Sequence, residues 1–162
     1  MSEAFSQRPA TADDLHEVVG FVQNADELFF AFPRATWPLT VGQLETARLG
    51  RRNATVALLG GQLAGYANFY QWQQGASCAL GNLMVAPWAR RHGVAHYLIG
   101  SMEQQARHDF AATHLQASCF NGNSAGLLLY TRLGYAVNAI VERQHPNGER
   151  VALVQFSKAL NS

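Results

Sequence analysis

Hydrophobic and polar positions along this chain repeat with two periods, which separate predicted strands from predicted helices. Apolar residues at every second position predict strands, and apolar residues three and four apart predict helices. The predicted strands are residues 5–9, 55–59, 63–72, 78–85, 114–118 and 151–156. The predicted helices are residues 12–23, 27–30 and 42–51, a long helix from Val94, and a short helix between Asn123 and Gly134. This order predicts a mixed α/β sandwich around a central sheet.

The segment from Val85 to Ala95 joins an apolar strand to a helix through a basic turn. Pro87 cannot donate a hydrogen bond to a sheet, so the strand is expected to stop before it. In the turn, Gly93 lets the backbone approach a ligand, and the free N–H groups of the first helical turn lie beside Arg90 and Arg91. The segment predicts an anion site that fits a diphosphate. The alternative is a surface helix that carries arginine near a turn.

A second segment, residues 123–135, has the pattern of a short helix between two strands. Asn123 is a good N-cap residue, and Gly134 is well placed as the residue that ends the helix. Asn123 and Tyr130 are seven residues apart, which places them on one helix face about 10 Å apart along the axis. Both side chains can therefore contact one extended ligand. The dipeptide Asn147-Gly148 predicts the turn of a final hairpin.

These two segments resemble the motifs of the GNAT superfamily of acetyl-CoA-dependent N-acetyltransferases. In that family a strand ending in Val-x-Pro leads to an Arg/Gln-x-x-Gly-x-Gly/Ala turn, which Arg90 to Ala95 match. The later motif, Asn-x-x-Ala-x-x-Leu-Tyr-x-x-x-Gly-Phe/Tyr, is matched at Asn123, Leu129, Tyr130, Gly134 and Tyr135. Gly126 stands where the family usually has Ala, and this departure, the loss of one methyl group, puts little of the resemblance in doubt.

The resemblance extends from residue 8 to residue 156 and implies a single N-acetyltransferase domain over residues 1–162. In such a domain a mixed, mostly antiparallel sheet is flanked by helices, and the fourth and fifth strands separate to form a slot for the cofactor. Acetyl-CoA is the implied cosubstrate, and an amine is the implied acceptor. The residues expected to bind acetyl-CoA are Met84, Val85, Arg90, Arg91, His92, Gly93, Val94, Ala95, Asn123 and Tyr130.

Acetyl transfer to an amine requires a neutral amine and a proton for the departing thiolate. Tyr130 is the best candidate for the general acid, because a phenol with a pKa near 10 stays protonated at neutral pH and can donate to a thiolate of pKa about 8.5. The alternative is a core tyrosine on an amphipathic helix.

The general base is not evident from the sequence. Many relatives place a glutamate on the fourth strand, but residues 78–85 contain no carboxylate. A water relay is therefore favoured, with Asn68, Tyr70 and Asn82 as its anchors. His92 and His96 are alternatives for the base, and Glu103 is expected to be a surface charge, with a substrate-binding or relay group as the alternative.

The acceptor site is expected to be formed by the aromatic and acidic segment of residues 26–38 together with alternate residues of the strand 63–72. Aromatic walls and acidic groups suit a cationic amine. The residues expected to contact the acceptor are Asp26, Glu27, Phe29, Phe32, Asn68, Tyr70 and Asn82.

Residues 26–29 and 68–72 together also resemble a small bacterial GNAT subgroup associated with acetylation of lysine at peptide C-termini. A terminal carboxylate needs a hydrogen-bond donor, for which Arg34 and backbone N–H groups are the candidates. Two alternatives stay open. One is an acetyltransferase for a small amine such as an amino acid, polyamine or drug, and the other is a non-catalytic acyl-CoA-binding domain.

Composition limits the remaining classes of function. The 162 residues are 48% apolar, which is enough for one core, and a net charge of +1 without a basic run argues against nucleic acid as a partner. No signal peptide or apolar stretch of about 18 residues is found, so a cytoplasmic protein without a membrane partner is expected. Cys78 and Cys119 lack partners at zinc spacing and are expected to be core thiols, so no metal is expected. The sequence leaves monomer or homodimer open.

Overall fold

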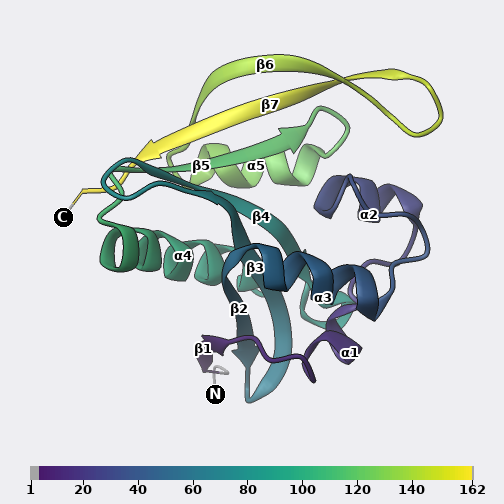
Figure 1. Ribbon diagram of the computed structural model, residues 1–162, viewed down its shortest axis with the longest axis horizontal. Coiled ribbons are helices and arrows are strands. Elements are labelled where there is room, and N and C mark those ends of the chain that lie inside the picture. Colours follow the sequence, from purple (N-terminus) through teal and green to yellow (C-terminus); the bar gives the residue numbers. More distant parts are fainter. Residues whose placement is uncertain (1–3, 162) are drawn as a thin grey trace.

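The computed structural model describes residues 4–161 and contains a mixed sheet in the order β1-β2-β3-β4-β5-β7-β6 (Figure 1). The strands are β1 (Phe5–Pro9), β2 (Arg52–Leu59), β3 (Gln62–Trp72), β4 (Ser77–Val85), β5 (His114–Phe120), β6 (Ala136–Gln144) and β7 (Arg150–Ala159). The helices are α1 (Leu15–Val18), α2 (Ala25–Ala31), α3 (Val41–Gly50), α4 (Val94–Phe110) and α5 (Ser124–Arg132), with a short 3₁₀ turn η1 (Pro87–Ala89). All neighbouring strands are antiparallel except β4 and β5. The predicted α/β fold is confirmed.

The prediction of one helix over residues 12–23 is wrong. The α-helix there is the four-residue α1, and the backbone on both sides of it forms tighter turns, in which an N–H group donates to the carbonyl three residues back. A new helix then starts at Asn24, whose side chain accepts a hydrogen bond from the N–H of Glu27 at 2.9 Å. This cap also makes α2 longer than the predicted residues 27–30. Strands β2 and β5 likewise extend beyond the predicted residues 55–59 and 114–118.

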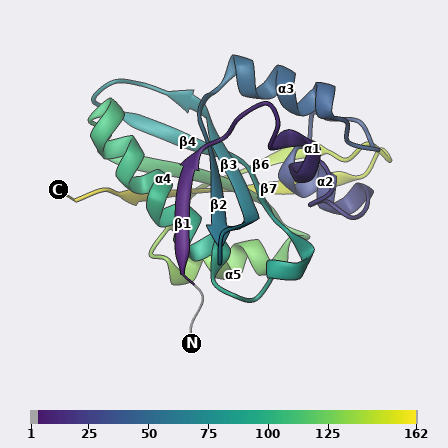
Figure 2. The ribbon, with the colours of Figure 1, turned by 90° about the horizontal axis from the view of Figure 1, so that it is seen from below.

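Helices cover both faces of the β1–β4 half of the sheet. Strands β2 and β3 lie between α4 on one side and the group of α1, α2 and α3 on the other (Figure 2). Helix α4 packs closely because Gly65 of β3 has no side chain, and a Cβ atom there would lie 2.9 Å from Val94. Helix α5 packs beneath β5 (Figure 1). None of the described helices is both long and apolar enough to cross a bilayer.

The parallel pair of β4 and β5 is short and then separates. Only Ser77, Cys78 and Ala79 of β4 pair with β5, and from there β4 continues along β3 while β5 continues along β7. One register shift between β3 and β4 falls at the separation, between Ala79 and Leu80, and the other falls beyond it, between Gly81 and Met84. Asn82, within the second shift, has a φ of 50°. Such bulges bend a strand and increase its twist. The expected slot between the fourth and fifth strands is therefore present.

An ion pair joins the first strand to the first helix. Arg8 donates two hydrogen bonds to the carboxylate of Asp14, at 2.7 and 2.9 Å, and the N–H of Thr11 adds a third at 2.8 Å. Asp14 is buried, and the hydrogen bonds from Arg8 lower the pKa of its carboxyl from 3.8 to about 2. The pair holds α1 against the end of β1.

Asp14→Asn should destabilise the fold at neutral pH by about 1–3 kcal/mol, because it leaves the hydrogen bonds of Arg8 and Thr11 incomplete. A carboxyl whose folded-state pKa is lowered contributes stability above its ordinary pKa of 3.8, and this contribution is lost as the pH falls through about 2. The stability difference from wild type, measured by urea unfolding, should therefore shrink over that range. Asp13→Asn alters an exposed neighbour and is the control. A difference that does not depend on pH would contradict the ion pair.

Candidate active site

A cleft of about 1430 Å³ opens where β4 and β5 separate. Its walls come from α2, β3, β4, β5, α5 and the hairpin of β6 and β7. The predicted site residues that line it are Glu27, Phe29, Phe32, Tyr70, Asn82, Met84, Val85, Arg90, Asn123 and Tyr130. The remaining predicted residues, Asp26, Asn68, Arg91, His92, Gly93, Val94 and Ala95, do not line it. The fold thus brings residues from both predicted halves of the site to one cavity, while residues 91–95 of the predicted cofactor turn do not line it.

The turn before α4 has the backbone of an anion site. Arg91 and Gly93 both have positive φ angles, of 67° and 85°, so successive N–H groups can point to one side of the chain. The first-turn N–H groups of α4 have no acceptor within the helix. Arg91, His92 and Gly93 are exposed. Backbone donors and the Arg91 guanidinium are therefore groups that suit a diphosphate.

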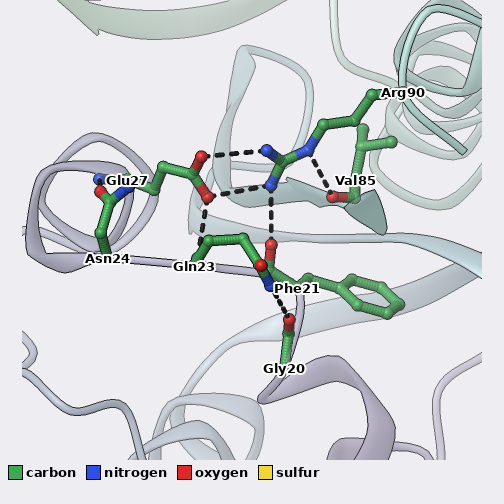
Figure 3. Close-up of polar contacts among 7 residues, drawn as sticks. All are labelled: Gly20, Phe21, Gln23, Asn24, Glu27, Val85 and Arg90. Atoms are coloured by element: carbon green, nitrogen blue, oxygen red, sulfur yellow. Dashed lines mark hydrogen bonds and ion pairs between the residues drawn. The ribbon is translucent and has the colours of Figure 1, made fainter. Parts of the chain in front are cut away.

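Arg90 and Glu27 were predicted to bind different ligands, but the structure pairs them with each other (Figure 3). The guanidinium donates two hydrogen bonds of 2.9 Å to the carboxylate, and these lower the pKa of Glu27. Arg90 also donates to the carbonyl oxygens of Phe21 at 2.8 Å and Val85 at 3.3 Å. The pair ties α2 to the end of β4. Glu27 is therefore neutralised, and the other acid of that segment, Asp26, has a side chain 81% exposed that approaches His145 at 4.0 Å.

Tyr130 lies at the point where the strands separate. Its ring packs against Tyr135 and Phe156, with centroids 5.6 and 5.5 Å away. No residue within 4–161 makes a hydrogen bond to the Tyr130 hydroxyl. Every fully buried side-chain nitrogen or oxygen of these residues has a hydrogen-bond partner, so this hydroxyl is accessible from the cleft. Burial raises the pKa of Tyr130, and the neighbouring Cys119 and Tyr70 raise it further. Tyr130 is thus a protonated phenol on the wall of the cleft.

The start of α5 explains the glycine that departs from the family motif. Asn123 caps the helix by accepting a hydrogen bond from the N–H of Gly126 at 3.1 Å. A Cβ atom at Gly126 would lie 2.7 Å from the sulfur of Cys119 and 2.8 Å from the amide nitrogen of Asn123. Glycine fits here because the sulfur of Cys119 and the amide of Asn123 occupy the space that a methyl group would need. Cys119 is a buried thiol whose pKa burial raises to about 11.

The cleft lining does not include the other candidates for the base or relay, which are His92, His96 and Glu103. Glu103 is neither a surface charge nor a relay group, because its carboxylate accepts hydrogen bonds from the hydroxyl of Tyr135 at 2.7 Å and from Lys158 at 3.1 Å. His92 and His96 are exposed and lie outside the cleft. No cluster of three His, Cys, Asp or Glu side chains suited to a metal ion occurs among the described residues.

Arg51 was not predicted from the sequence, and the structure places it on the cleft wall beside Phe32 and Tyr70. Its Nη1 donates to the side-chain oxygens of Asn82 at 2.8 Å and Asn68 at 3.2 Å. The amide of Asn68 also donates to Asn82 at 3.0 Å, and Asn82 donates to the carbonyl of Ala31 at 3.1 Å. Two amides among apolar neighbours were the available signal, because buried amides need partners. The partner of both amides is the guanidinium of Arg51, the residue that follows α3. The sequence pattern alone does not show that Arg51 lies beside these amides.

The acetyltransferase (GNAT) family model matches residues 13–135, which is most of the chain. No protein in a search of curated sequences matches.

Solved structures of acetyltransferases share the whole fold. The enzyme that modifies the N-terminal serine of ribosomal protein L7/L12 in Salmonella typhimurium is 12% identical, with 97% of this chain and 95% of that chain covered and a TM-score of 0.81. The ribosomal-protein-alanine N-acetyltransferase of Brucella melitensis is 25% identical, with coverages of 96% and 99% and a TM-score of 0.72. The structure of yncA from Salmonella typhimurium with its cofactor acetyl-CoA is 19% identical, with coverages of 98% and 95% and a TM-score of 0.73.

Gly93→Glu should weaken acetyl-CoA binding at least tenfold, about 1.4 kcal/mol, because it places a carboxylate beside the expected diphosphate position. Gly61→Glu is a matched control, since Gly61 has a similar φ of 81° but lies in the turn between β2 and β3. Both variants carry the same backbone strain and the same added charge. Titration calorimetry with acetyl-CoA should show the loss only for Gly93→Glu. Equal affinities of the two variants would remove this turn from the cofactor site.

Proposed function

Because the chain belongs to the acetyltransferase (GNAT) family and is an acetyl-CoA-dependent N-acetyltransferase, we propose that its acceptor is a lysine at the C-terminus of a peptide. The lysine side-chain amine attacks the thioester directly, and Tyr130 acts as the general acid. The observation that carries this proposal is that Tyr130 lines the same cleft as the aromatic side chains of α2 and β3.

The reaction needs one bond to form and one to break. The amine nitrogen attacks the carbonyl carbon of the acetyl group, the carbon–sulfur bond breaks, and the sulfur keeps the electron pair. The Tyr130 hydroxyl then gives its proton to the thiolate. The acylated nitrogen loses its extra proton to water in the cleft, and a proton from this water restores the Tyr130 phenol. Burial raises the pKa of Tyr130, but a thiolate in the same low-dielectric cleft also gains proton affinity, so the transfer between the two groups stays feasible.

The attacking amine must first lose a proton. For a lysine of pKa about 10.4, deprotonation at pH 7 costs about 4.6 kcal/mol. Glu27, the acidic residue that lines the cleft, is engaged by Arg90. Polar side chains on the two separated strands, Asn82 on β4 with Gln116 and Ser118 on β5, can anchor water in the cleft. We assign proton removal to this water, which exchanges with solvent.

The acceptor end of the cleft suits a long aliphatic amine. Phe29, Phe32 and Tyr70 line it, and Phe29 is held between Phe120 at 4.2 Å and His145 at 4.5 Å, measured between ring centroids. Aromatic rings can pack along the four methylene groups of lysine while its charged end extends beyond them. This packing favours a lysine side chain over a short α-amino group.

Tyr130→Phe removes only the hydroxyl and should lower kcat by about 10²- to 10⁴-fold with little change in KM, as expected for loss of a general acid. Tyr97→Phe is the control, because Tyr97 stacks on Phe5 away from the cleft. Turnover can be followed by release of free thiol. A kcat within threefold of wild type would mean that Tyr130 has a packing role and water protonates the thiolate.

A peptide ending in lysine should be acetylated faster than the same peptide with an internal lysine or with an amidated C-terminus. Loss of a hydrogen bond to a charged group costs about 1.5–3 kcal/mol, which corresponds to about a ten- to hundredfold fall in kcat/KM for the amide. Mass spectrometry of the products identifies the acetylated nitrogen. Equal rates for acid and amide would leave a general amine acetyltransferase.

A further inference from the structure

We propose that Arg51, with Arg34 beside it, is the binding site for the carboxylate of the acceptor. This inference rests on the proposed function, which sets the orientation of the acceptor lysine in the cleft. It assigns the carboxylate to a residue that neither the family motifs nor the sequence pattern indicates. Arg51 lines the cleft together with Arg34, Phe32 and Tyr70.

Arg51 carries a charge that the fold does not neutralise. Its hydrogen-bond partners are the neutral side-chain oxygens of Asn68 and Asn82, and no carboxylate of residues 4–161 pairs with it. Burial lowers the pKa of Arg51, and the like charge of Arg34 lowers it further. A cation kept in a partly desolvated cleft without an acid is costly, and a bound carboxylate relieves that cost.

Three other basic side chains are in ion pairs, which are Arg90 with Glu27, Arg48 with Glu45, and Lys158 with Glu103. Arg51 lines the cleft and is in no ion pair within residues 4–161. Arg34 and Arg143 also line the cleft and are in no ion pair there. The cleft wall therefore retains positive charge, and Arg51 is the cation that the two amides hold in place.

The guanidinium of Arg51 is held in place with donors to spare. Its Nη1 is fixed by the two amide oxygens, and its plane lies near the rings of Phe32 and Tyr70, with the central carbon 5.4 and 5.8 Å from their centroids. Within residues 4–161, its Nε and Nη2 atoms donate no hydrogen bond. An arginine with a fixed plane and two free donors can bind a carboxylate through paired hydrogen bonds.

The site also lies at the right place relative to Tyr130. Arg51, Tyr70 and Tyr130 line the same cleft, and the central carbon of the guanidinium lies 5.8 Å from the centroid of the Tyr70 ring. A lysine whose carboxylate lies on Arg51 can therefore extend its side chain past Tyr70 toward the Tyr130 hydroxyl. In this arrangement, binding of the C-terminal carboxylate by Arg51 determines which lysine of a peptide reaches Tyr130.

The test compares a lysine-terminated peptide and its C-terminal amide as substrates for wild type, Arg51→Gln and Arg52→Gln. Glutamine can still donate to the neighbouring amides but has no charge. Arg52 is the matched control, since it is adjacent in sequence, exposed, and packs on Trp72 outside the cleft. Wild type and Arg52→Gln should prefer the acid by about ten- to a hundredfold in kcat/KM. In Arg51→Gln this preference should fall below threefold.

A binding measurement separates this inference from the proposed acceptor. In titration calorimetry with coenzyme A present, hexanoate should bind wild type more tightly than hexanamide does, and Arg51→Gln should lose the difference. Arg51-dependent hexanoate binding without acetylation of any lysine peptide would support the carboxylate site and contradict the acceptor class. An acid preference that survives in a folded Arg51→Gln protein, checked by circular dichroism, would overturn the role of Arg51 and leave the lysine acceptor standing. Arg51→Lys should recover part of the preference.

Discussion

The separation of β4 from β5 is the constraint on which the rest of the site depends. The two strands share only three residue pairs, because β4 stays paired with β3 and β5 stays paired with β7. Beyond those pairs, backbone groups and side chains of both strands line a cavity instead of a sheet. Tyr130 of α5 and Asn82 of β4 consequently face the same space. A continued β4–β5 ladder would close it.

Two polar networks hold the helices that cover one end of this cleft. Arg90 and Glu27 connect the end of β4 to α2, and Arg51 connects β3 and β4 through Asn68 and Asn82. Asn82 also donates to Ala31 at the end of α2, so both networks reach the same helix. The first network is charge-balanced and serves the fold. The second retains a positive charge at the cleft wall, which gives the acceptor side its proposed selectivity for a carboxylate.

Local sequence signals were enough for the parts of the site that are close together along the chain. Asn123 caps α5, and Tyr130 on that helix lines the cleft, as the spacing within one helix predicted. The contacts that sequence reasoning missed join distant residues: Arg90 and Glu27 are 63 positions apart, and Arg51 and Asn82 are 31 apart. Periodicity predicts which face of an element is buried but not which side chain lies opposite. The false helix over residues 12–23 has a different cause, because the cap at Asn24 and the preceding tight turns interrupt a pattern that looks helical.

The central claim is that one cleft aligns a thioester at Tyr130 with a lysine whose carboxylate lies at Arg51. A crystal structure with coenzyme A and a peptide ending in Nε-acetyl-lysine tests it most directly. The account predicts that the coenzyme A sulfur lies within hydrogen-bond distance of the Tyr130 hydroxyl, and that the terminal carboxylate accepts hydrogen bonds from the Arg51 guanidinium. A sulfur remote from Tyr130, or a carboxylate in solvent while Arg51 keeps only Asn68 and Asn82 as partners, would contradict it.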